Sequence, residues 1–178
     1  MKFPKFKWLF VGLCVVSFFP NSLIAQENSQ WKVSLRSVGP IKIGMTVQQA
    51  KKRSGVRLKT VYTYPDPSCF YVASKKVPAG VKFMVVDGKI RRIDITESTV
   101  STLSGARVGD REKKIRKLYG KKIVVEAHKY DEQGHYLIYV PKDKWDKKYR
   151  LIFETSKKRV TQFRIGLLPE VEWVEGCL

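Results

Sequence analysis

The pattern of apolar and polar positions predicts a short helix followed by several strands, and it does so twice. The first helix is expected over residues 47–54. The second follows residue 110, where Ile115, Leu118 and Tyr119 form an i, i+3, i+4 apolar face. Runs rich in β-branched and aromatic residues follow each helix. The predicted strand regions are 56–64, 69–74 and 81–96 in the first half, and 121–130, 135–140, 149–155 and 159–167 in the second.

The segment around each helix is a repeat. Residues 39–55 are GPIKIGMTVQQAKKRSG, and residues 104–120 are SGARVGDREKKIRKLYG. In both copies one glycine precedes the helix and another closes it at the same spacing, and Ala50 falls opposite Ile115. The repeat predicts an α+β fold with two tandem units, each a short helix followed by an antiparallel meander of three to four strands.

These observations divide the chain into five parts. The predicted parts are a signal peptide (1–25), an N-terminal tail that leads into a short first strand (26–37), a first αβ unit (38–98), a second αβ unit (99–168) and an acidic C-terminal tail that carries a disulfide (169–178).

Local signals predict the helix ends and one turn. Thr46 and Gln49 fit a capping box, and Gly55 is placed to end the first helix in a left-handed conformation. Asp110 is the expected N-cap of the second helix. Asp87-Gly88 predicts a type I′ hairpin turn. A strict two-residue turn would put the apolar residues of the two strands on opposite faces, so we also expect a bulge after it.

The N-terminus has the pattern of a secretory signal peptide. Three lysines precede a short apolar run, and small and polar residues follow, with cleavage expected near Ala25. The alternative is a retained membrane anchor, but the apolar run is short for a membrane span. Cys14 follows Leu13, where a lipidation signal needs a small residue, so we expect no lipid anchor. The protein is predicted to be exported, either to the periplasm or as a secreted protein.

Removal of residues 1–25 leaves two cysteines, Cys69 and Cys177. Two cysteines in an exported chain usually pair. A disulfide that closes a loop of about a hundred residues stabilises the fold by roughly 4–5 kcal/mol in the chain-entropy model. The alternatives are two buried thiols or two metal ligands. Neither cysteine has a histidine or another cysteine at short spacing, so we predict a disulfide.

The chain is strongly basic. Without the three lysines of the signal peptide, 32 basic residues face 16 acidic ones, for a charge of about +16. No nucleic-acid-binding motif is present, so we expect no nucleic-acid partner. For an exported protein the same charge favours an anionic envelope component, namely a lipid headgroup, lipopolysaccharide or a cell-wall polymer.

The opening of the first copy resembles a known superfamily. Gly44-Met45-Thr46 with Ala50, in a duplicated unit of an exported chain, is similar to the superfamily of the β-lactamase inhibitor protein. That superfamily also holds the small outer-membrane lipoproteins that assist barrel assembly. The ending Glu175-Gly176-Cys177 resembles that of a group of uncharacterised exported bacterial proteins. The resemblance implies helices laid on an antiparallel sheet and a role in protein–protein contact without catalysis. It implies no specific partner-binding residue.

Candidate catalytic residues are few, and we predict that the protein is not an enzyme and has no cofactor. His128 and His135 lie on either side of Asp131, near an expected hairpin end, where we predict solvated side chains and not a metal site. Glu170, Glu172 and Glu175 are close together, but nothing in the sequence predicts a cleft that excludes water around them. The alternative from a different class is an envelope hydrolase centred on the two histidines.

The predicted binding surface is the basic segment at residues 141–150, where aromatic residues alternate with cations. Such a segment suits an anionic or interfacial partner, unless Trp145 folds back onto the sheet edge. The tyrosines of the predicted strands are a second candidate, since about half of them should face away from the core. The expected function is contact with an envelope component or another protein, and the alternative is inhibition of a secreted enzyme. The candidate residues of the basic segment are Trp145, Tyr149, Lys144, Lys147, Lys148 and Arg150.

Overall fold

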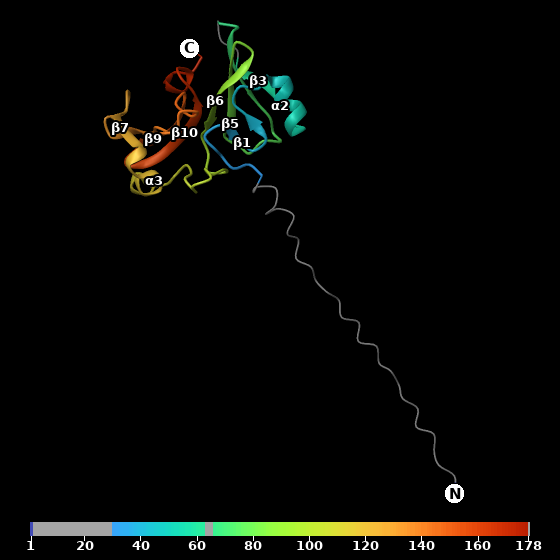
Figure 1. Ribbon diagram of the computed structural model, residues 1–178, viewed down its shortest axis with the longest axis horizontal. Helices are drawn as coiled ribbons and strands as arrows, with labels where there is room; N and C mark the ends of the chain where they lie inside the picture. Colours follow the sequence, from blue (N-terminus) through green and yellow to red (C-terminus); the bar gives the residue numbers. More distant parts are fainter. Residues whose placement is uncertain (2–29, 63–65, 178) are drawn as a thin grey trace.

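An eight-stranded antiparallel sheet forms the centre of the fold (Figure 1). The computed structural model describes residues 30–62 and 66–177, together with Met1. The strands lie across the sheet in the order β3-β4-β5-β6-β10-β9-β8-β7, and every neighbouring pair is antiparallel. Their bounds are β3 Lys59–Tyr62, β4 Cys69–Ala73, β5 Val81–Val86, β6 Lys89–Ile95, β7 Ile123–Ala127, β8 Gly134–Tyr139, β9 Tyr149–Ser156 and β10 Arg159–Leu167.

Two short helices and a small two-stranded sheet complete the fold. Figure 1 shows α2 beside the first group of strands and α3 beside the second. The elements are β1 Ser37–Val38, β2 Ile41–Lys42, α2 Val47–Ser54, α3 Glu112–Tyr119, and the 3₁₀ turns η1 Gly120–Lys122 and η2 Glu170–Glu172. The prediction of an α+β fold with two helix-plus-meander units is confirmed. The predicted signal peptide, including Cys14 and the cleavage position near Ala25, lies outside the described residues apart from Met1.

The two units share one sheet. Each contributes four strands to this sheet, and β6 of the first pairs with β10 of the second, with Ile95 opposite Phe163 and Ile93 opposite Ile165. All four of these side chains are at most 1% exposed. The junction is therefore part of the main core, which runs through both units.

The hairpin between β5 and β6 has the predicted turn and the predicted bulge. Asp87 and Gly88 have φ angles of 50° and 74°. The register then shifts, and Phe83 lies opposite Ile93. This extra residue on β6 brings the apolar side chains of both strands to the same face, which is why the bulge is needed.

The helices and the N-terminal segment cover one face of the sheet. Ala50 of α2 and Ile115 of α3 are fully buried in the main core. Trp31 and Val33 are buried there too, and Val33 forms bridges to Val38 and to Thr102. Residues 30–37, which we expected to be a polar tail, therefore belong to the core-forming structure.

Only one of the two predicted N-caps is correct. Thr46 accepts a hydrogen bond from the Gln49 amide at 3.1 Å, and the Gln49 side chain accepts one from the Thr46 amide at 2.9 Å. The second helix has Arg111 as its N-cap, without a side-chain cap. Asp110 instead accepts a hydrogen bond from the Arg107 amide and pairs with Lys114 at 2.8 Å. Asp110 therefore lies one residue before the N-cap, and its carboxylate bonds back to Arg107.

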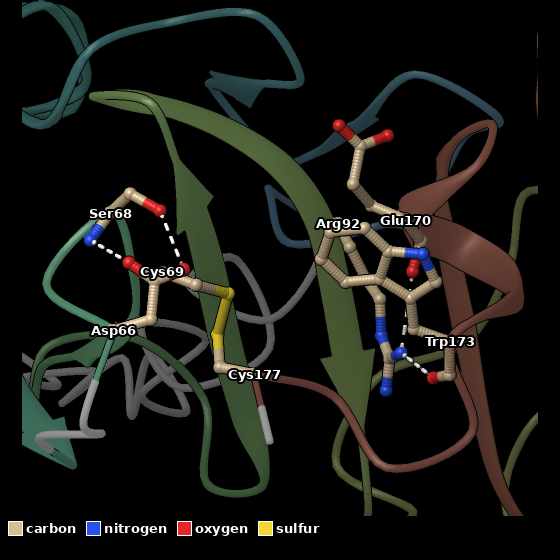
Figure 2. The surroundings of a disulfide bond; sticks show 7 residues. All are labelled: Asp66, Ser68, Cys69, Arg92, Glu170, Trp173 and Cys177. Carbon is tan, nitrogen blue, oxygen red and sulfur yellow. Dashed lines mark hydrogen bonds between the residues drawn. A yellow bond between two sulfur atoms is a disulfide. The ribbon is translucent and has the colours of Figure 1, made fainter.

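The C-terminal segment, residues 168–177, crosses the other face of the sheet. Cys69 and Cys177 form the predicted disulfide, with their Cα atoms 5.4 Å apart. Figure 2 shows the segment approaching Arg92 before it reaches this bond. The Arg92 guanidinium donates to the carbonyl oxygens of Glu170 and Trp173. The segment is therefore held by a covalent bond at its end and by hydrogen bonds along its length.

Candidate functional site

The loop between β8 and β9 contains four of the six predicted binding residues, while Tyr149 and Arg150 begin β9. Two aspartates organise the backbone of this loop. The Asp143 carboxylate accepts a hydrogen bond from the Trp145 amide at 2.8 Å, and its carbonyl accepts one from the Asp146 amide at 3.0 Å. The Asp146 carbonyl then accepts one from the Tyr149 amide at 2.8 Å. Aspartates favour such turns because their side chains satisfy nearby amides. The loop therefore has a defined conformation around Trp145.

Arg36 ties this loop to the N-terminal segment. Its guanidinium donates to the Asp146 carboxylate at 2.6 Å and to the Trp145 carbonyl at 3.1 Å, and lies 5.1 Å from the centre of the Tyr149 ring. The hydrogen bond and negative charge of Asp146 raise the pKa of Arg36. Sequence reasoning missed Arg36, because 110 residues separate it from Asp146 and no local pattern relates the two.

Trp145 points into solvent. Its exposed fraction is 74%, which decides against the alternative that it folds back onto the sheet edge. The Lys144 ammonium lies 5.2 Å from the centre of the indole ring, within the range of a cation–π contact. The loop therefore presents a large aromatic side chain and a neighbouring positive charge together.

The six predicted residues have two different roles. Trp145, Lys144, Lys147 and Lys148 are exposed. Tyr149, which we expected to be an exposed aromatic, is partly buried against the main core. Arg150 donates to the carbonyl oxygens of Lys147 and Tyr149, each at 2.8 Å. Four residues therefore form the accessible surface, whereas Tyr149 and Arg150 hold the loop in place.

The strand tyrosines form no continuous exposed row in the described part of the chain. Tyr71 and Tyr136 are buried, and Tyr139 packs against the main core. Tyr62 is 49% exposed and lies near Lys82. Tyr64 lies outside the described residues. The loop around Trp145 is consequently the more accessible of the two candidate surfaces.

The two histidines lie on opposite faces of the sheet, and the prediction that both are merely solvated is wrong. The His128 ring stacks on Tyr136, with 4.6 Å between ring centres, and lies 3.5 Å from the Glu154 carboxylate. His135, the strand neighbour of Tyr136, points the other way and contacts Glu112 of α3 at 2.9 Å. Adjacent residues of a strand point to opposite faces, so these two rings do not form one site.

A buried charged cluster lies beneath the C-terminal segment, and sequence reasoning did not identify it. Arg164 and Glu154 form an ion pair in which both residues are at most 5% exposed. Gln162 donates to Glu154 at 2.6 Å, and Arg164 donates to the Val171 carbonyl at 2.6 Å. In the sequence these residues resemble the solvent-facing positions of ordinary strands. Only the segment that covers them makes them buried.

Glu170 lies on the same face of the sheet as the Glu154–Arg164 pair. It is 5% exposed, although nothing in the sequence predicted a cleft that excludes water around it. One of its oxygens accepts a hydrogen bond from Arg91 at 2.7 Å, and the other has no partner among the described residues. Arg91 is the extra residue of the bulge in β6. Arg91 and the following Arg92 both bind Glu170, Arg91 at its side chain and Arg92 at its backbone carbonyl.

Two buried carboxylates have lowered pKa values. Burial by itself would raise the pKa of Glu154, but the charge of Arg164 and hydrogen bonds from Gln162, Arg164 and His128 bring it below its ordinary value of 4.5. Burial also opposes the shift at Glu112, where hydrogen bonds from Thr155 and His135 bring the pKa below 4.5. Both groups are therefore ionised in the folded protein at neutral pH.

The lowered pKa values predict loss of stability in acid. A carboxylate whose pKa is lower in the folded than in the unfolded state stabilises the fold above its unfolded pKa, and this contribution disappears as the pH falls through the folded pKa. We expect the free energy of unfolding to decrease as the pH falls below about 4.5. Urea denaturation between about pH 3 and pH 7 would measure this. A Glu154→Gln variant should show a shallower dependence, and an equal slope would contradict the prediction.

Comparison with known proteins relates the chain to solved structures at low similarity. No protein-family model and no curated protein sequence matches it. It is similar to the uncharacterized protein yfeY from Escherichia coli, with a TM-score of 0.48 and 17% identity over 76% of this chain and 99% of that one. It is also similar to an extracellular protein containing an SCP domain from Bacillus anthracis str. Ames, with a TM-score of 0.43 and 10% identity over 71% of this chain and 44% of that one. The resemblance to the β-lactamase inhibitor protein superfamily therefore remains a proposal.

Two further observations concern residues 30–62 and 66–177. No group of three or more His, Cys, Asp or Glu side chains gathers there in a way that suits a metal ion. No helix in these residues has both the length and the apolar character needed to cross a membrane.

Proposed function

We propose that this is an exported, non-catalytic binding protein that contacts an anionic surface of the cell envelope through the loop around Trp145. The observation that carries the proposal is the 74% exposure of this tryptophan on a loop held by Arg36, Asp143 and Asp146. Exposing an indole to water is unfavourable, whereas tryptophan is enriched in interfaces and in the boundary region of membranes. Holding the loop in one conformation reduces the entropy lost on binding.

The charge around the tryptophan supports an anionic partner. Lys144, Lys147 and Lys148 are exposed next to it, and the chain as a whole carries a large excess of basic residues. Basic residues near an anionic membrane each contribute about 1 kcal/mol of attraction. An indole that enters the headgroup region and lysines that remain at its surface would contribute together. This arrangement favours an anionic lipid surface over a neutral one.

Export is supported by two independent features. The N-terminal residues have the order of a secretory signal peptide, and Cys69 is bonded to Cys177. Stable disulfides are typical of oxidising compartments outside the cytoplasm. The resemblance of Gly44-Met45-Thr46 to the β-lactamase inhibitor protein superfamily also agrees with a non-catalytic role, although a protein partner would then be the natural occupant of the surface.

The two alternatives differ in their support. Inhibition of a secreted enzyme would require an acidic target, because the charge of this protein would repel a basic one. A hydrolase centred on His128 and His135 is disfavoured by geometry, since the two side chains lie on opposite faces of the sheet and each is engaged by a carboxylate. We therefore retain the inhibitor as the second hypothesis.

Truncating Trp145 to alanine is expected to weaken membrane binding about tenfold or more while the free energy of unfolding changes by less than about 0.5 kcal/mol. The physical reason is that the indole makes few contacts within the protein. Cosedimentation with vesicles of phosphatidylglycerol and phosphatidylcholine measures the binding, and urea denaturation measures the stability. The matched control is Leu103→Ala, which truncates a side chain that is 72% exposed elsewhere on the protein.

Three outcomes contradict the lipid proposal. One is equal vesicle binding by the wild type and the Trp145 variant. Another is binding that is unchanged between about 0.1 M and 1 M salt, because electrostatic attraction at a surface is screened over this range. The third is a crosslink to a single protein partner when a photo-crosslinking residue is placed at position 145 in the native envelope, which would favour the inhibitor or protein-contact hypothesis. Crosslinks to lipid would support the proposal.

A further inference from the structure

The two units join their helices to their hairpins in the same way, which allows a position-by-position comparison. In the first unit, the Gly44 amide donates to the Ile90 carbonyl at 2.7 Å, at the start of α2. In the second, the Gly109 amide donates to the Val160 carbonyl at 2.8 Å, at the start of α3. The next hydrogen bond runs in the other direction in each unit. The Ile90 amide donates to the Met45 carbonyl at 2.8 Å, and the Val160 amide donates to the Asp110 carbonyl at 2.9 Å. Each helix therefore begins against the turn of the last hairpin in its own unit.

In each unit an isolated β-bridge also links the start of the helix to the hairpin. Thr46 pairs with Lys89 in the first unit, and Arg111 pairs with Arg159 in the second, both in antiparallel orientation. Arg111 therefore stands where the first unit has Thr46. The two residues of the β9–β10 turn, Lys157-Lys158, stand where the first unit has Asp87-Gly88.

The backbone is the same in both turns, but the residues suit it only in the first. Asp87 and Gly88 have φ angles of 50° and 74°, and Lys157 and Lys158 have φ angles of 48° and 62°. Positive φ favours glycine, aspartate and asparagine, and it is unfavourable for a lysine because of its Cβ atom. The second unit therefore places two lysines in a conformation that disfavours them.

At the N-cap of the helix, too, the second unit has a cation in place of a residue that favours the local structure. Thr46 forms a capping box with Gln49, whereas Arg111 has no side-chain cap. At both places the second unit has cations where the first has residues that favour the local structure. Violations of local preference in an otherwise regular fold tend to occur at functional sites. The shared consequence of these replacements is positive charge at one end of the second unit.

These cations surround a hollow of about 530 Å³. None of them is within salt-bridge distance of a carboxylate in the described part of the chain, and Arg159 donates only to the Gly109 carbonyl. The one acidic residue in the lining is Glu112, whose carboxylate turns inward to Thr155 at 2.6 Å and to His135 at 2.9 Å. The six cationic residues that line the hollow are Arg111, Lys113, Arg116, Lys157, Lys158 and Arg159.

We propose that this hollow binds a ligand that carries several phosphate groups. Arginine guanidinium groups match phosphate oxygens in a bidentate geometry, and lysines add charge without a fixed direction. A phosphate monoester carries a charge between −1.5 and −2 at neutral pH, so two or three of them balance the lining. The volume falls within the range of small-molecule sites. The residues of the β9–β10 turn line the hollow at one end of β9, whereas the loop around Trp145 is joined to the other end of that strand, so this site is separate from the surface proposed above.

Inorganic tripolyphosphate is the probe for the test, and isothermal titration calorimetry of the full mature chain at low salt is the measurement. We expect saturable binding by the wild type. In Lys157→Asn with Lys158→Gly, we expect affinity about tenfold lower, since two exposed cations are lost. The same double variant should melt about 3–6 °C higher, because both residues now suit the turn. The control, Lys75→Asn with Lys76→Asn, removes the same charge from the other unit and should bind like the wild type.

The opposite changes in stability and affinity separate this site from general electrostatic attraction. Absence of tripolyphosphate binding by the wild type, or equal weakening in both double variants, would overturn the proposal. Trp145→Ala should leave tripolyphosphate binding unchanged, so failure of the membrane proposal and failure of this one are distinguishable. Competition between tripolyphosphate and vesicles that carry phosphorylated lipids, measured on Trp145→Ala to remove the first surface, then identifies the source of the phosphates. Vesicle binding by this variant that tripolyphosphate displaces indicates a lipid headgroup, and the absence of such binding indicates a soluble ligand.

Discussion

Replacing Glu154 with glutamine is expected to lower the free energy of unfolding by about 3–5 kcal/mol. The carboxylate and the Arg164 guanidinium are both buried, and Gln162 and His128 also contact the carboxylate. The substitution leaves a buried positive charge without its counter-charge. Removing one partner of such a pair is far more unfavourable than replacing the pair as a whole. Urea denaturation at pH 7 would measure the loss.

Two variants make this result specific. Glu126→Gln removes an exposed carboxylate from the neighbouring strand β7 and should change the free energy of unfolding by less than about 0.5 kcal/mol. Glu154→Gln combined with Arg164→Met removes both charges and should recover much of the lost stability, which a double-mutant cycle quantifies. A loss below about 1 kcal/mol in the single variant would mean that water reaches the pair and screens the charge.

Removing the disulfide is expected to lower the free energy of unfolding by about 2–5 kcal/mol. Cys69 and Cys177 are 108 residues apart, so the bond closes a long loop and restricts the unfolded chain strongly. The double variant Cys69→Ala with Cys177→Ala avoids a free thiol, and denaturant titration measures its stability. The remaining C-terminal segment should stay bound up to Trp173, because Arg92 and Arg164 donate hydrogen bonds to its carbonyl oxygens.

Hydrogen exchange would show where the disulfide acts. In the double variant, amides beyond Trp173 should exchange fastest, and amides of β6 and β10 should remain protected. A reducing agent should destabilise the wild type and leave the double variant unchanged. If the wild type in reducing agent has the same denaturation midpoint as without it, then the disulfide contributes little and the prediction is wrong.

The buried pair and the disulfide concern the same face of the sheet. The C-terminal segment covers Glu154 and Arg164, and the disulfide holds the end of that segment. Release of the segment would give water access to the pair and weaken its electrostatic interaction. We therefore expect the two losses to be less than additive when Glu154→Gln is combined with the cysteine double variant.

The candidate site was partly predictable. The alternation of lysines with Trp145 identified the β8–β9 loop, because a cluster of cations around a tryptophan is visible in the local sequence. Arg36 was not predictable, since it reaches the loop from a distant segment. Tyr149 was misjudged because its face depends on the register of β9 with β8, where Tyr139 lies opposite Leu151. An exposed and a buried position differ by one residue of register.

The sequence by itself determined the local structure. The period of the apolar residues, the capping box of Thr46 and Gln49 and the turn at Asp87-Gly88 act over a few residues, and they specified the helix and strand order of both units. Only the tertiary structure decided what covers each face of the sheet. Burial of Glu154, the opposite directions of the two histidines and the cationic hollow around Lys157 all depend on contacts between distant segments. Their energies arise from desolvation and charge, which a local pattern of residues does not contain.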